Sequence, residues 1–306
     1  MAHLSEKHIQ ENHMSQKTEF DVIVIGGGPG GYVTAIRAMQ LGMSAAVVER
    51  EHLGGICLNW GCIPTKALLR AAEIKHNITH AADFGIEVSG EVTVNLQKVV
   101  ERSRKVASSL SSGVAHLLKK NKVAVFDGTA KIAGKSGANW AISVAGVNQT
   151  KLSGKHIIIA TGARARALPG IEPNGTSIVT YKDAMTPQEM PKSLIVVGSG
   201  AIGVEFASFY NDMGVDVTII EYFDRILNAE DEEISAMAQK SFEKRGIKIF
   251  TSVKLVGLEE TSSGVTADIK IGAKSQQLYA ERVIMAVGIV GNSENLGLET
   301  AKVKQE

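Results

Sequence analysis

The only two cysteines of the chain, Cys57 and Cys62, are separated by four residues, and Lys66 lies four positions after the second. If a helix begins near Cys62, then Cys62 and Lys66 share one face of its first turn. Two thiols at this spacing can form a disulfide if their Cβ atoms approach closely. A thiol beside a helix N-terminus and a lysine should have a depressed pKa, which favours the thiolate. We therefore interpret the stretch as a redox-active thiol pair that can form an intramolecular disulfide.

Two other interpretations of the cysteines stay open. Cytosolic cysteines are commonly buried and inert, and a zinc site would use the same residue type. Zinc is the weaker alternative, because no second pair of Cys or His follows at ligand spacing. His3, His8 and His13 could bind metal, but we expect residues 1–19 to be a disordered tail and predict no metal site.

A dinucleotide-binding fingerprint precedes the cysteines. The apolar run at residues 20–25 predicts a buried parallel strand, and a glycine-rich turn and a helical pattern at residues 32–41 follow it. Glycine lets the backbone turn sharply and approach a pyrophosphate, which the helix N-terminus then faces. A second strand at residues 44–48 ends at Glu49, whose carboxylate can accept hydrogen bonds from ribose hydroxyls. The candidate residues of the turn are Gly26, Gly28, Gly30 and Gly31.

The same pattern recurs 172 residues later, with strands predicted at residues 194–197 and 217–220 and a helix from the turn to residue 210. Two fingerprints in one register imply two nucleotide-binding domains. The second strand ends at Glu221, a carboxylate that favours the free 2′-hydroxyl of NAD and repels the 2′-phosphate of NADP. The candidate residues of this turn are Gly198, Gly200, Ala201, Ile202 and Gly203.

The remaining patterns predict helices and short strands around the two fingerprints. The proline-containing stretch at residues 164–193 is interpreted as a connection between domains. In the long helix at residues 95–121, the charges of Arg102, Arg104, Lys119 and Lys120 are interpreted as a solvated face. Further helices are predicted at residues 66–80 and 231–245, and strands at residues 123–126, 131–132, 140–144, 156–159, 248–250, 266–271 and 282–286.

Composition limits the class of protein. Lys and Arg number 33 and Asp and Glu 32, so the net charge of +1 gives no electrostatic reason to bind nucleic acid or an anionic membrane. No apolar run approaches the roughly 18–20 residues of a membrane span, and residues 1–19 lack the apolar core of a secretory signal. We therefore predict a cytoplasmic protein, in which a close pair of cysteines favours catalysis over a disulfide scaffold.

Residues 54–66, Gly-Gly-Ile-Cys-Leu-Asn-Trp-Gly-Cys-Ile-Pro-Thr-Lys, resemble the redox motif GGxCxNxGCxPxK of the flavin-dependent pyridine nucleotide–disulfide oxidoreductases at every fixed position. The resemblance extends from about residue 18 to residue 306. It implies an α/β fold with two Rossmann-like three-layer domains, the second inserted into the first, and a small β-meander in the FAD domain. The implied boundaries are residues 20–166 for the FAD-binding domain, 167–288 for the NAD-binding domain and 289–306 for a return to the FAD domain.

Within this family, residues 200–207 and 221–227 resemble the dihydrolipoyl dehydrogenase branch. Glutathione reductases typically carry a basic residue where Glu221 stands, whereas mercuric reductases stay an alternative. The implied reaction takes two electrons from dihydrolipoamide, through the cysteine pair and FAD, to NAD. The implied partner is a lipoyl-carrier protein of a 2-oxo acid dehydrogenase complex, and the full-length members of the family are homodimers.

The resemblance also assigns roles to residues of this chain. Cys57 would be the interchange thiol and Cys62 the charge-transfer thiol against the flavin, with Lys66 beside the flavin N5 and paired with Glu205. Glu49 would hold the flavin ribose. The other residues implied on the flavin side are Arg50, Gly55, Gly128, Ala130, Thr161, Gly162 and Ala163. Val253 and Gly288 would complete the nicotinamide side, to which Glu205 is also assigned.

Two parts of the family pattern have no counterpart in residues 1–306. The second flavin motif, ending in Gly-Asp, and the C-terminal interface domain with its His–Glu base would both lie beyond Glu306. The resemblance thus implies the N-terminal portion of such an enzyme, with weak FAD retention expected of the portion alone. The alternative is a nucleotide-binding remnant without turnover.

Overall fold

The computed structural model describes residues 17–146 and 149–305. The predicted tail, with its three histidines, falls outside these ranges except for its last residues. Glu19, assigned to that tail, is instead the first residue of strand β1 (Glu19–Ile25), and the backbone N–H of Ser153 donates to the carbonyl of Thr18 over 2.8 Å. Strand β1 therefore begins one residue before the apolar run that predicted it.

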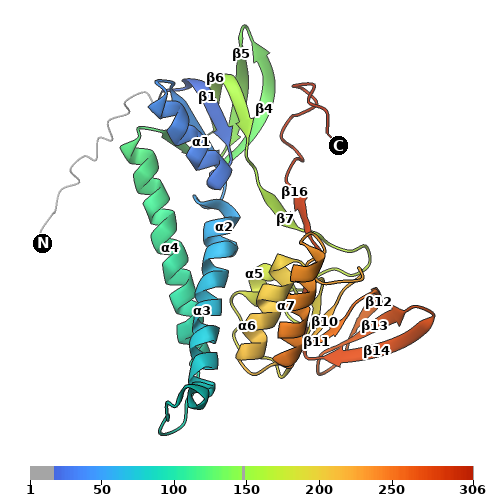
Figure 1. The fold of residues 1–306 in the computed structure, drawn as a ribbon. Helices are drawn as coiled ribbons and strands as arrows, with labels where there is room; N and C mark the ends of the chain where they lie inside the picture. Colours follow the sequence, from blue (N-terminus) through green and yellow to red (C-terminus); the bar gives the residue numbers. More distant parts are fainter. Residues whose placement is uncertain (1–16, 147–148, 306) are drawn as a thin grey trace, which may run out of the picture.

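A mixed six-stranded sheet forms the upper unit in Figure 1, in the order β3-β2-β1-β6-β5-β4. Strands β1, β2, β3 and β6 run parallel, while β4, β5 and β6 form an antiparallel meander. Helix α1 (Pro29–Gln40) connects β1 to β2, with Pro29 in its first turn where no N–H partner is needed. The other strands are β2 (Ala45–Glu49), β3 (Ala124–Asp127), β4 (Thr129–Ser136), β5 (Asn139–Ala145) and β6 (Thr150–Ile159).

Two long helices run side by side from this sheet down to the other end of the molecule (Figure 1). Helix α3 (Cys62–Thr79) begins four residues before the helix predicted at residues 66–80, and η1 (Ala81–Phe84) follows it. Helix α4 (Leu96–Lys120) returns, capped by the side chain of Asn95, which accepts from the N–H of Lys98 at 2.9 Å. The six-residue helix α2 (Gly55–Trp60), which was not predicted, precedes α3.

The lower unit is built on a second sheet, all parallel, in the order β11-β10-β9-β15-β8. A three-stranded antiparallel sheet, β12-β13-β14, packs beside it. Asp231 caps α7 by accepting from the N–H of Glu233 at 2.9 Å. The elements are β8 (Ile178–Val179), α5 (Tyr181–Ala184), β9 (Ser193–Val197), α6 (Ala201–Asp212), β10 (Asp216–Ile220), α7 (Glu232–Lys244), β11 (Lys248–Phe250), β12 (Val253–Glu260), β13 (Val265–Ile271), β14 (Lys274–Ala280) and β15 (Arg282–Met285).

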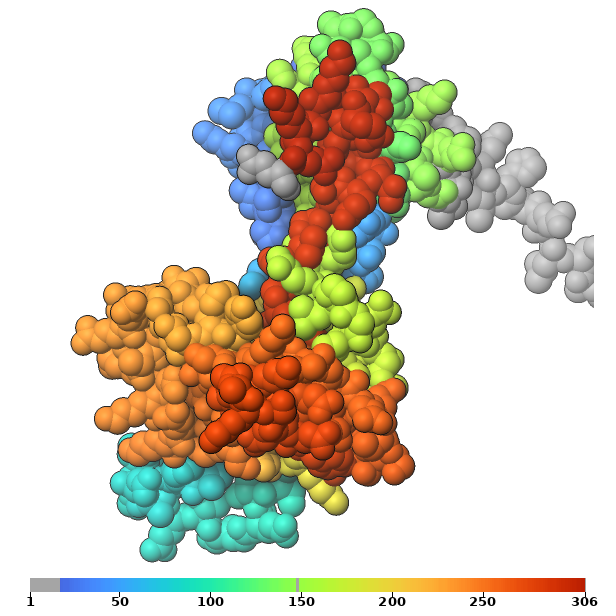
Figure 2. Space-filling model, turned by 90° about the vertical axis from the view of Figure 1, so that its right-hand side faces the viewer, coloured from blue at the N-terminus to red at the C-terminus, as the bar shows by residue number. Residues whose placement is uncertain are grey.

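Residues 164–193 are only partly a connection. They contain β8 and α5, which belong to the lower unit, and Tyr181 and Met185 are buried in its core. The crossing itself is made by β7 (Ala163–Ala165), which pairs antiparallel with β16 (Ile289–Gly291). Figure 2 shows these two segments, yellow-green and red, at the narrow waist between the units.

After β16 the chain returns to the upper sheet. Leu296 and Leu298 are buried in the same core as Phe20 and Ile142, and the N–H of Ile132 donates to the carbonyl of Leu296 over 2.8 Å. The lower unit is therefore enclosed in sequence by two segments that pack on the upper sheet. The α/β fold with parallel-sheet cores is confirmed.

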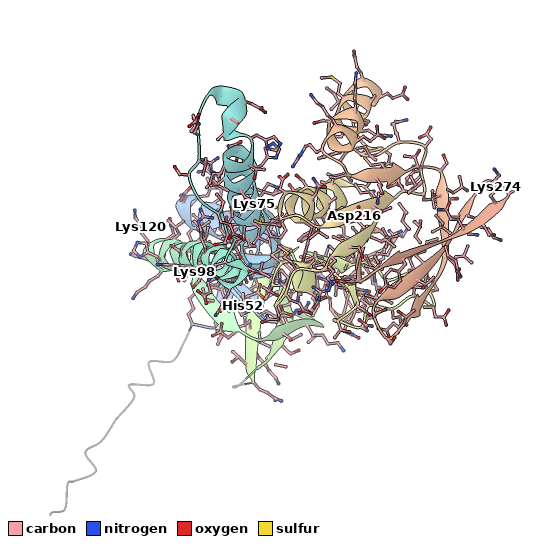
Figure 3. All side chains as sticks on the ribbon, turned by 90° about the horizontal axis from the view of Figure 1, so that it is seen from below. His52, Lys75, Lys98, Lys120, Asp216 and Lys274 are labelled. Carbon is pink, nitrogen blue, oxygen red and sulfur yellow. The ribbon has the colours of Figure 1, made fainter. Side chains whose placement is uncertain are left out.

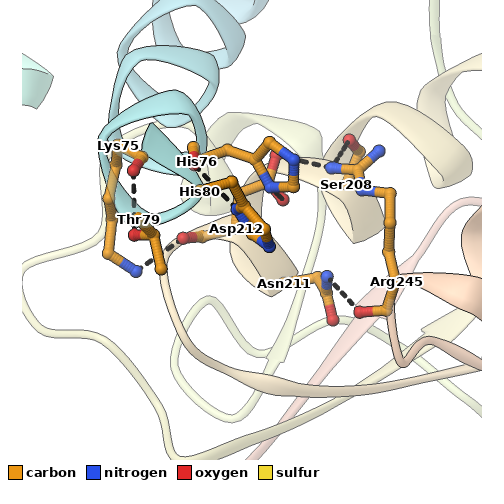
Figure 4. Close-up of polar contacts among 8 residues, drawn as sticks. All are labelled: Lys75, His76, Thr79, His80, Ser208, Asn211, Asp212 and Arg245. Atoms are coloured by element: carbon orange, nitrogen blue, oxygen red, sulfur yellow. Dashed lines mark hydrogen bonds and ion pairs between the residues drawn. The ribbon is translucent and has the colours of Figure 1, made fainter. Parts of the chain in front are cut away.

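Helix α3 also packs against the lower unit. Leu68 and Ala72 of α3 share a core with Phe206 and Phe209 of α6. Further along, Lys75, His76 and His80 face the end of α6 and the residue after α7 in a polar cluster (Figure 4). Seen from below in Figure 3, Lys75 lies on the side of α3 toward the lower unit, whereas Lys120 of α4 lies on the opposite side of the molecule. No helix of the described residues is long and apolar enough to cross a bilayer.

Candidate functional site

The first fingerprint forms one wall of a groove of about 420 Å³ in the upper unit. A Cβ on Gly31 would stand 1.8 Å from the carbonyl oxygen of Gly26, so only glycine lets α1 pack this closely on the turn. The N-terminus of α1 is thereby held open toward the groove, with no side chain at Gly28 or Gly30 to fill it. This cradle fits the pyrophosphate of a dinucleotide.

The carboxylate of Glu49 is fixed at the rim of this groove. Its Oε2 accepts from the N–H of Gly27 at 2.6 Å, and its Oε1 accepts from the N–H of Glu51 at 2.8 Å. Each carboxylate oxygen has further lone pairs, so Glu49 can still accept hydrogen bonds from a ribose. The other predicted residues that line the groove are Arg50, Gly55, Cys57, Thr161, Gly162 and Ala163.

The second fingerprint builds the same geometry in the lower unit. A Cβ on Gly203 would stand 2.1 Å from the carbonyl oxygen of Gly198. Glu221 accepts from the N–H and the hydroxyl of Ser199 at 2.7 and 2.5 Å, and from the N–H of Phe223 at 2.9 Å. These partners stand 172 positions after those of Glu49, so the repeat in sequence is a repeat in hydrogen bonding. The site again fits a dinucleotide.

A second groove of about 480 Å³ lies at this fingerprint. Five predicted residues line it: Gly198, Gly200, Glu221, Val253 and Gly288. Sequence reasoning missed the aromatic pair Tyr222 and Phe223 and the cation Arg166, which line it as well. An aromatic dipeptide directly after the strand-end acid is the signal that could have found the pair.

Several predicted residues lie outside the two grooves. Gly128 and Ala130 line a separate recess of about 60 Å³ beside the first groove, together with Arg50 and Thr161. Ala201 and Ile202 are exposed in the first turn of α6 and are not among the residues that line the second groove. Glu205 is likewise absent from that lining and faces α3 instead.

The two cysteines are free thiols in this structure. Cys57 is partly buried in α2, and Cys62 is exposed as the first residue of α3. Burial raises the pKa of the Cys57 thiol, and its hydrogen bond with the Cys62 thiol acts in the same direction. The backbone N–H of Cys62 and the charge of Lys66 lower this pKa, but burial is the larger cause. The pKa of Cys57, which precedes the start of α3, is therefore shifted upward.

Lys66 and Glu205 form an ion pair that joins α3 to α6. The hydrogen bond that Lys66 donates to Glu205 raises the pKa of Lys66, against the smaller effect of burial. The charge of Lys66 also interacts with both thiols. The ion pair of Lys66 and Glu205 therefore connects the cysteines electrostatically to α6, the helix of the second fingerprint.

Arg104 of α4 does not lie on the solvated face predicted for it, whereas Arg102 is exposed as predicted and makes a backbone contact as well. Arg102 donates to the carbonyl of Ala67 in α3 at 3.0 Å, and Arg104 donates to the carbonyl of Asn59 in α2 at 2.7 Å. The signal for Arg104 was available in sequence, because Arg104 lies four positions after Val100 and so follows the apolar register of the helix.

No group of three or more His, Cys, Asp or Glu among the described residues could hold a metal ion. The arrangement instead combines two dinucleotide cradles with a thiol pair, one member of which, Cys57, lines the first groove. The arrangement therefore places a thiol pair, which can give up two electrons, beside the molecule that the first groove binds.

Comparisons with known proteins agree with this description. The family model described as pyridine nucleotide-disulphide oxidoreductase matches residues 20–306. The chain is 53% identical over 300 residues to a dihydrolipoyl dehydrogenase of Rhizobium etli, covering 94% of this chain and 62% of that protein. It is 49% identical over 286 residues to the enzyme of the same name from Zymomonas mobilis, covering 93% and 61%.

Two solved structures are similar. LpdA from Mycobacterium tuberculosis matches with a TM-score of 0.83 at 25% identity, over 93% of this chain and 61% of that one. The HOCl-induced flavoprotein disulfide reductase RclA from Escherichia coli, solved as a Cu(II) complex, matches with a TM-score of 0.79 at 23% identity, over 95% and 61%, and shows the fold alone. The chain spans about three fifths of the length of the relatives it matches. With its paired thiols and two glycine cradles, the chain belongs to the pyridine nucleotide-disulphide oxidoreductase family.

Proposed function

We propose that this chain carries out electron transfer of the dihydrolipoyl dehydrogenase type, from a dithiol substrate to NAD. The observation that carries the proposal is the position of Cys57, which lines the first dinucleotide groove while its partner Cys62 is exposed. The relatives named dihydrolipoyl dehydrogenase, at 49–53% identity, support the same activity.

The substrate step is a thiol–disulfide exchange. When Cys57 and Cys62 are joined, the two thiols of dihydrolipoamide replace the joined pair: one disulfide forms in the substrate, and the protein disulfide becomes two thiols. Two electrons and two protons pass to the protein. Return to the disulfide passes two electrons and one proton, the equivalent of a hydride, to NAD⁺, which becomes NADH, and the second proton goes to solvent.

The residues of the upper unit would hold FAD. The N-terminus of α1 would face the pyrophosphate, and the fixed carboxylate of Glu49 would accept from ribose hydroxyls. A flavin bound there supplies a reversible two-electron acceptor. Beside it, the Lys66 ammonium, oriented by Glu205, would stabilise negative charge on the reduced thiol pair.

The second groove would hold NAD rather than NADP. Both oxygens of Glu221 are held by donors, which fixes the carboxylate where the second strand ends. Negative charge there repels a 2′-phosphate and accepts from a free hydroxyl. The lipoyl-carrier partner, the homodimer and the cytoplasmic location stay predictions.

The test is lipoamide-dependent oxidation of NADH by the purified protein, with its flavin content recorded. We expect Cys57→Ser and Cys62→Ser each to abolish lipoamide turnover while leaving flavin and NADH binding unchanged. Turnover that survives both substitutions, or a protein that binds neither cofactor, would exclude the proposed activity.

A further inference from the structure

Arg104 makes three contacts from the middle of α4. One guanidinium nitrogen, Nη1, donates to the carbonyl of Asn59 at 2.7 Å, and the guanidinium carbon lies 4.6 Å from the centre of the Trp60 ring. The other, Nη2, lies 3.4 Å from the sulfur of Met185 in the lower unit. Its Nε is buried and has no hydrogen-bond partner in the described part of the chain. Arg104 is only partly exposed, and removing part of a cation from water costs free energy that these contacts offset in part.

Two of the three contacted residues lie between the two cysteines. Only four residues separate Cys57 from Cys62, and Arg104 holds two of them, Asn59 and Trp60. The amide of Asn59 in turn donates to the carbonyls of Leu53 and Gly55 at 3.0 and 2.9 Å. The short helix α2 is therefore tied at its beginning by Asn59 and at its end by Arg104.

Helix α2 needs such a tie. Six residues are too few for a helix to be stable by itself. The carbonyls at its C-terminal end favour a nearby cation, which the guanidinium provides. Beyond it, Gly61 breaks the helical conformation with φ −143° and ψ −124°, so the angle between α2 and α3 is set at this corner.

The corner is also tied to the lower unit. Met185 is fully buried in the lower core, and Trp60 packs against the same core. A second cation, Lys182 of α5, lies 5.8 Å from the Trp60 ring and lines the first groove. The indole of Trp60 is thus flanked by cations from two different elements.

We infer that Arg104 is a positioning residue for the redox pair: it fixes the corner between α2 and α3 and so sets how readily Cys57 and Cys62 join. A disulfide requires a narrow range of separation between its two residues. Holding the corner raises the effective concentration of one thiol at the other and favours the disulfide. The inference rests on the proposed function, because it concerns the same thiol pair.

The experiment measures the midpoint potential of the Cys57–Cys62 couple in the full chain. The chain is equilibrated in glutathione buffers of graded ratio, the free thiols are trapped by alkylation, and the peptides are quantified by mass spectrometry. Arg104→Met keeps the apolar stem but loses the donors and the charge, and Arg104→Lys keeps the charge alone. The matched control is Arg102→Met. It removes another arginine of α4, which donates to the backbone carbonyl of Ala67 in α3, away from the corner between α2 and α3.

We expect Arg104→Met to lower the equilibrium constant for disulfide formation about tenfold, which makes the potential about 30 mV less negative. The potential of Arg104→Lys should lie between those of the unsubstituted chain and Arg104→Met. Arg102→Met should leave the potential unchanged, even if it lowers the melting temperature as much as Arg104→Met does. An unmoved potential in Arg104→Met and Arg104→Lys, or an equal shift in Arg102→Met, would overturn the inference alone. An unsubstituted chain that forms no disulfide in any buffer would overturn the proposed function as well.

Discussion

At the scale of single residues, the reactivity of the thiol pair depends on the environment of Cys57. Burial beside the first groove raises its pKa, and the hydrogen bond with Cys62 adds to the rise. A raised thiol pKa means less thiolate at any given pH, so the reduced chain should react slowly at Cys57 near neutrality. The exposed Cys62 is open to solvent and to reagents.

We predict that alkylation of Cys57 by iodoacetamide follows a titration midpoint above that of an ordinary thiol such as glutathione. Cys62→Ser should lower this midpoint only in part, because burial is the larger cause of the shift. The rate is measured from pH 6 to pH 11 by mass spectrometry of the peptide that contains Cys57. A midpoint at or below that of glutathione would contradict the prediction.

Glu221 has a role in structure besides the selectivity proposed for it, because three donors depend on its carboxylate. We predict that the unsubstituted chain binds NADH more tightly than NADPH, and that Glu221→Ala weakens NADH binding by about 1–2 kcal/mol. The control is Glu49→Ala, which loses two equivalent hydrogen bonds in the first groove and should leave NADH binding unchanged. Equal affinities of the unsubstituted chain for the two nucleotides, measured by calorimetry, would refute the role of the carboxylate.

At the scale of elements, the sequence predicts best where the signal is local. The turns at Gly26 and Gly198 carry their glycines, their following helices and their strand-end acids within about twenty residues, so both were found with their boundaries nearly correct. Helix α2 was missed because a helix of six residues that starts with glycine has no periodicity to detect. Strand β14 was missed because its polar residues satisfy no alternating pattern.

Contacts between distant segments could not be predicted from such patterns. Arg104 lies 45 residues from Asn59 and 81 from Met185, and only the packing of α4 against α2 and the lower unit brings them together. The pair Lys66 and Glu205, 139 residues apart, came from the family resemblance and not from spacing. A pattern indicates which face of a helix is inside, but not which partner that face meets.

The contact of α1 with its turn gives a prediction at this scale. Gly31→Ala would place a Cβ 1.8 Å from the carbonyl of Gly26, so α1 must shift and the cradle must open. We expect a loss of about 3 kcal/mol in the free energy of unfolding, together with loss of bound flavin. In Gly30→Ala, the added Cβ meets nothing within 4 Å, and the stability should stay unchanged. Urea unfolding measures the stability of both variants, and equal free energies of unfolding would contradict the predicted clash.

At the scale of the whole molecule, α3 packs against the cores of both units. It begins with Cys62 at the upper sheet, carries Lys66 opposite α6, and ends in the polar cluster with Asp212 and Arg245 (Figure 4). The waist formed by β7 and β16 is another link between the units. The relative position of the two grooves therefore depends on how firmly α3 is held against α6 and α7.

The carboxylate of Asp212 is central to that attachment. Its side chain is only 8% exposed; its Oδ2 accepts from Arg245 at 2.5 Å, and its Oδ1 lies 3.5 Å from Nδ1 of His76 in α3. Lys75 adds a hydrogen bond to the backbone carbonyl of Asp212 at 2.6 Å, which a side-chain substitution leaves intact. Removing the negative charge would leave the guanidinium, 27% exposed and with a buried Nε, without its carboxylate.

We predict that Asp212→Asn lowers the free energy of unfolding by about 2–3 kcal/mol, below the range for a fully buried pair because the arginine keeps some contact with water. The matched control is Asp216→Asn, which breaks the pair with Lys248, whose side chains are 56% and 57% exposed; it should cost at most about 1 kcal/mol. Urea unfolding monitored by circular dichroism gives both values. Because α3 also carries Lys66, Asp212→Asn should loosen the contact of Lys66 with Glu205 and expose Leu68 and Ala72 to faster amide exchange, whereas Asp216→Asn should not. Equal costs for the two substitutions, or unchanged exchange along α3, would mean that the units are held by their apolar contacts and by the waist instead.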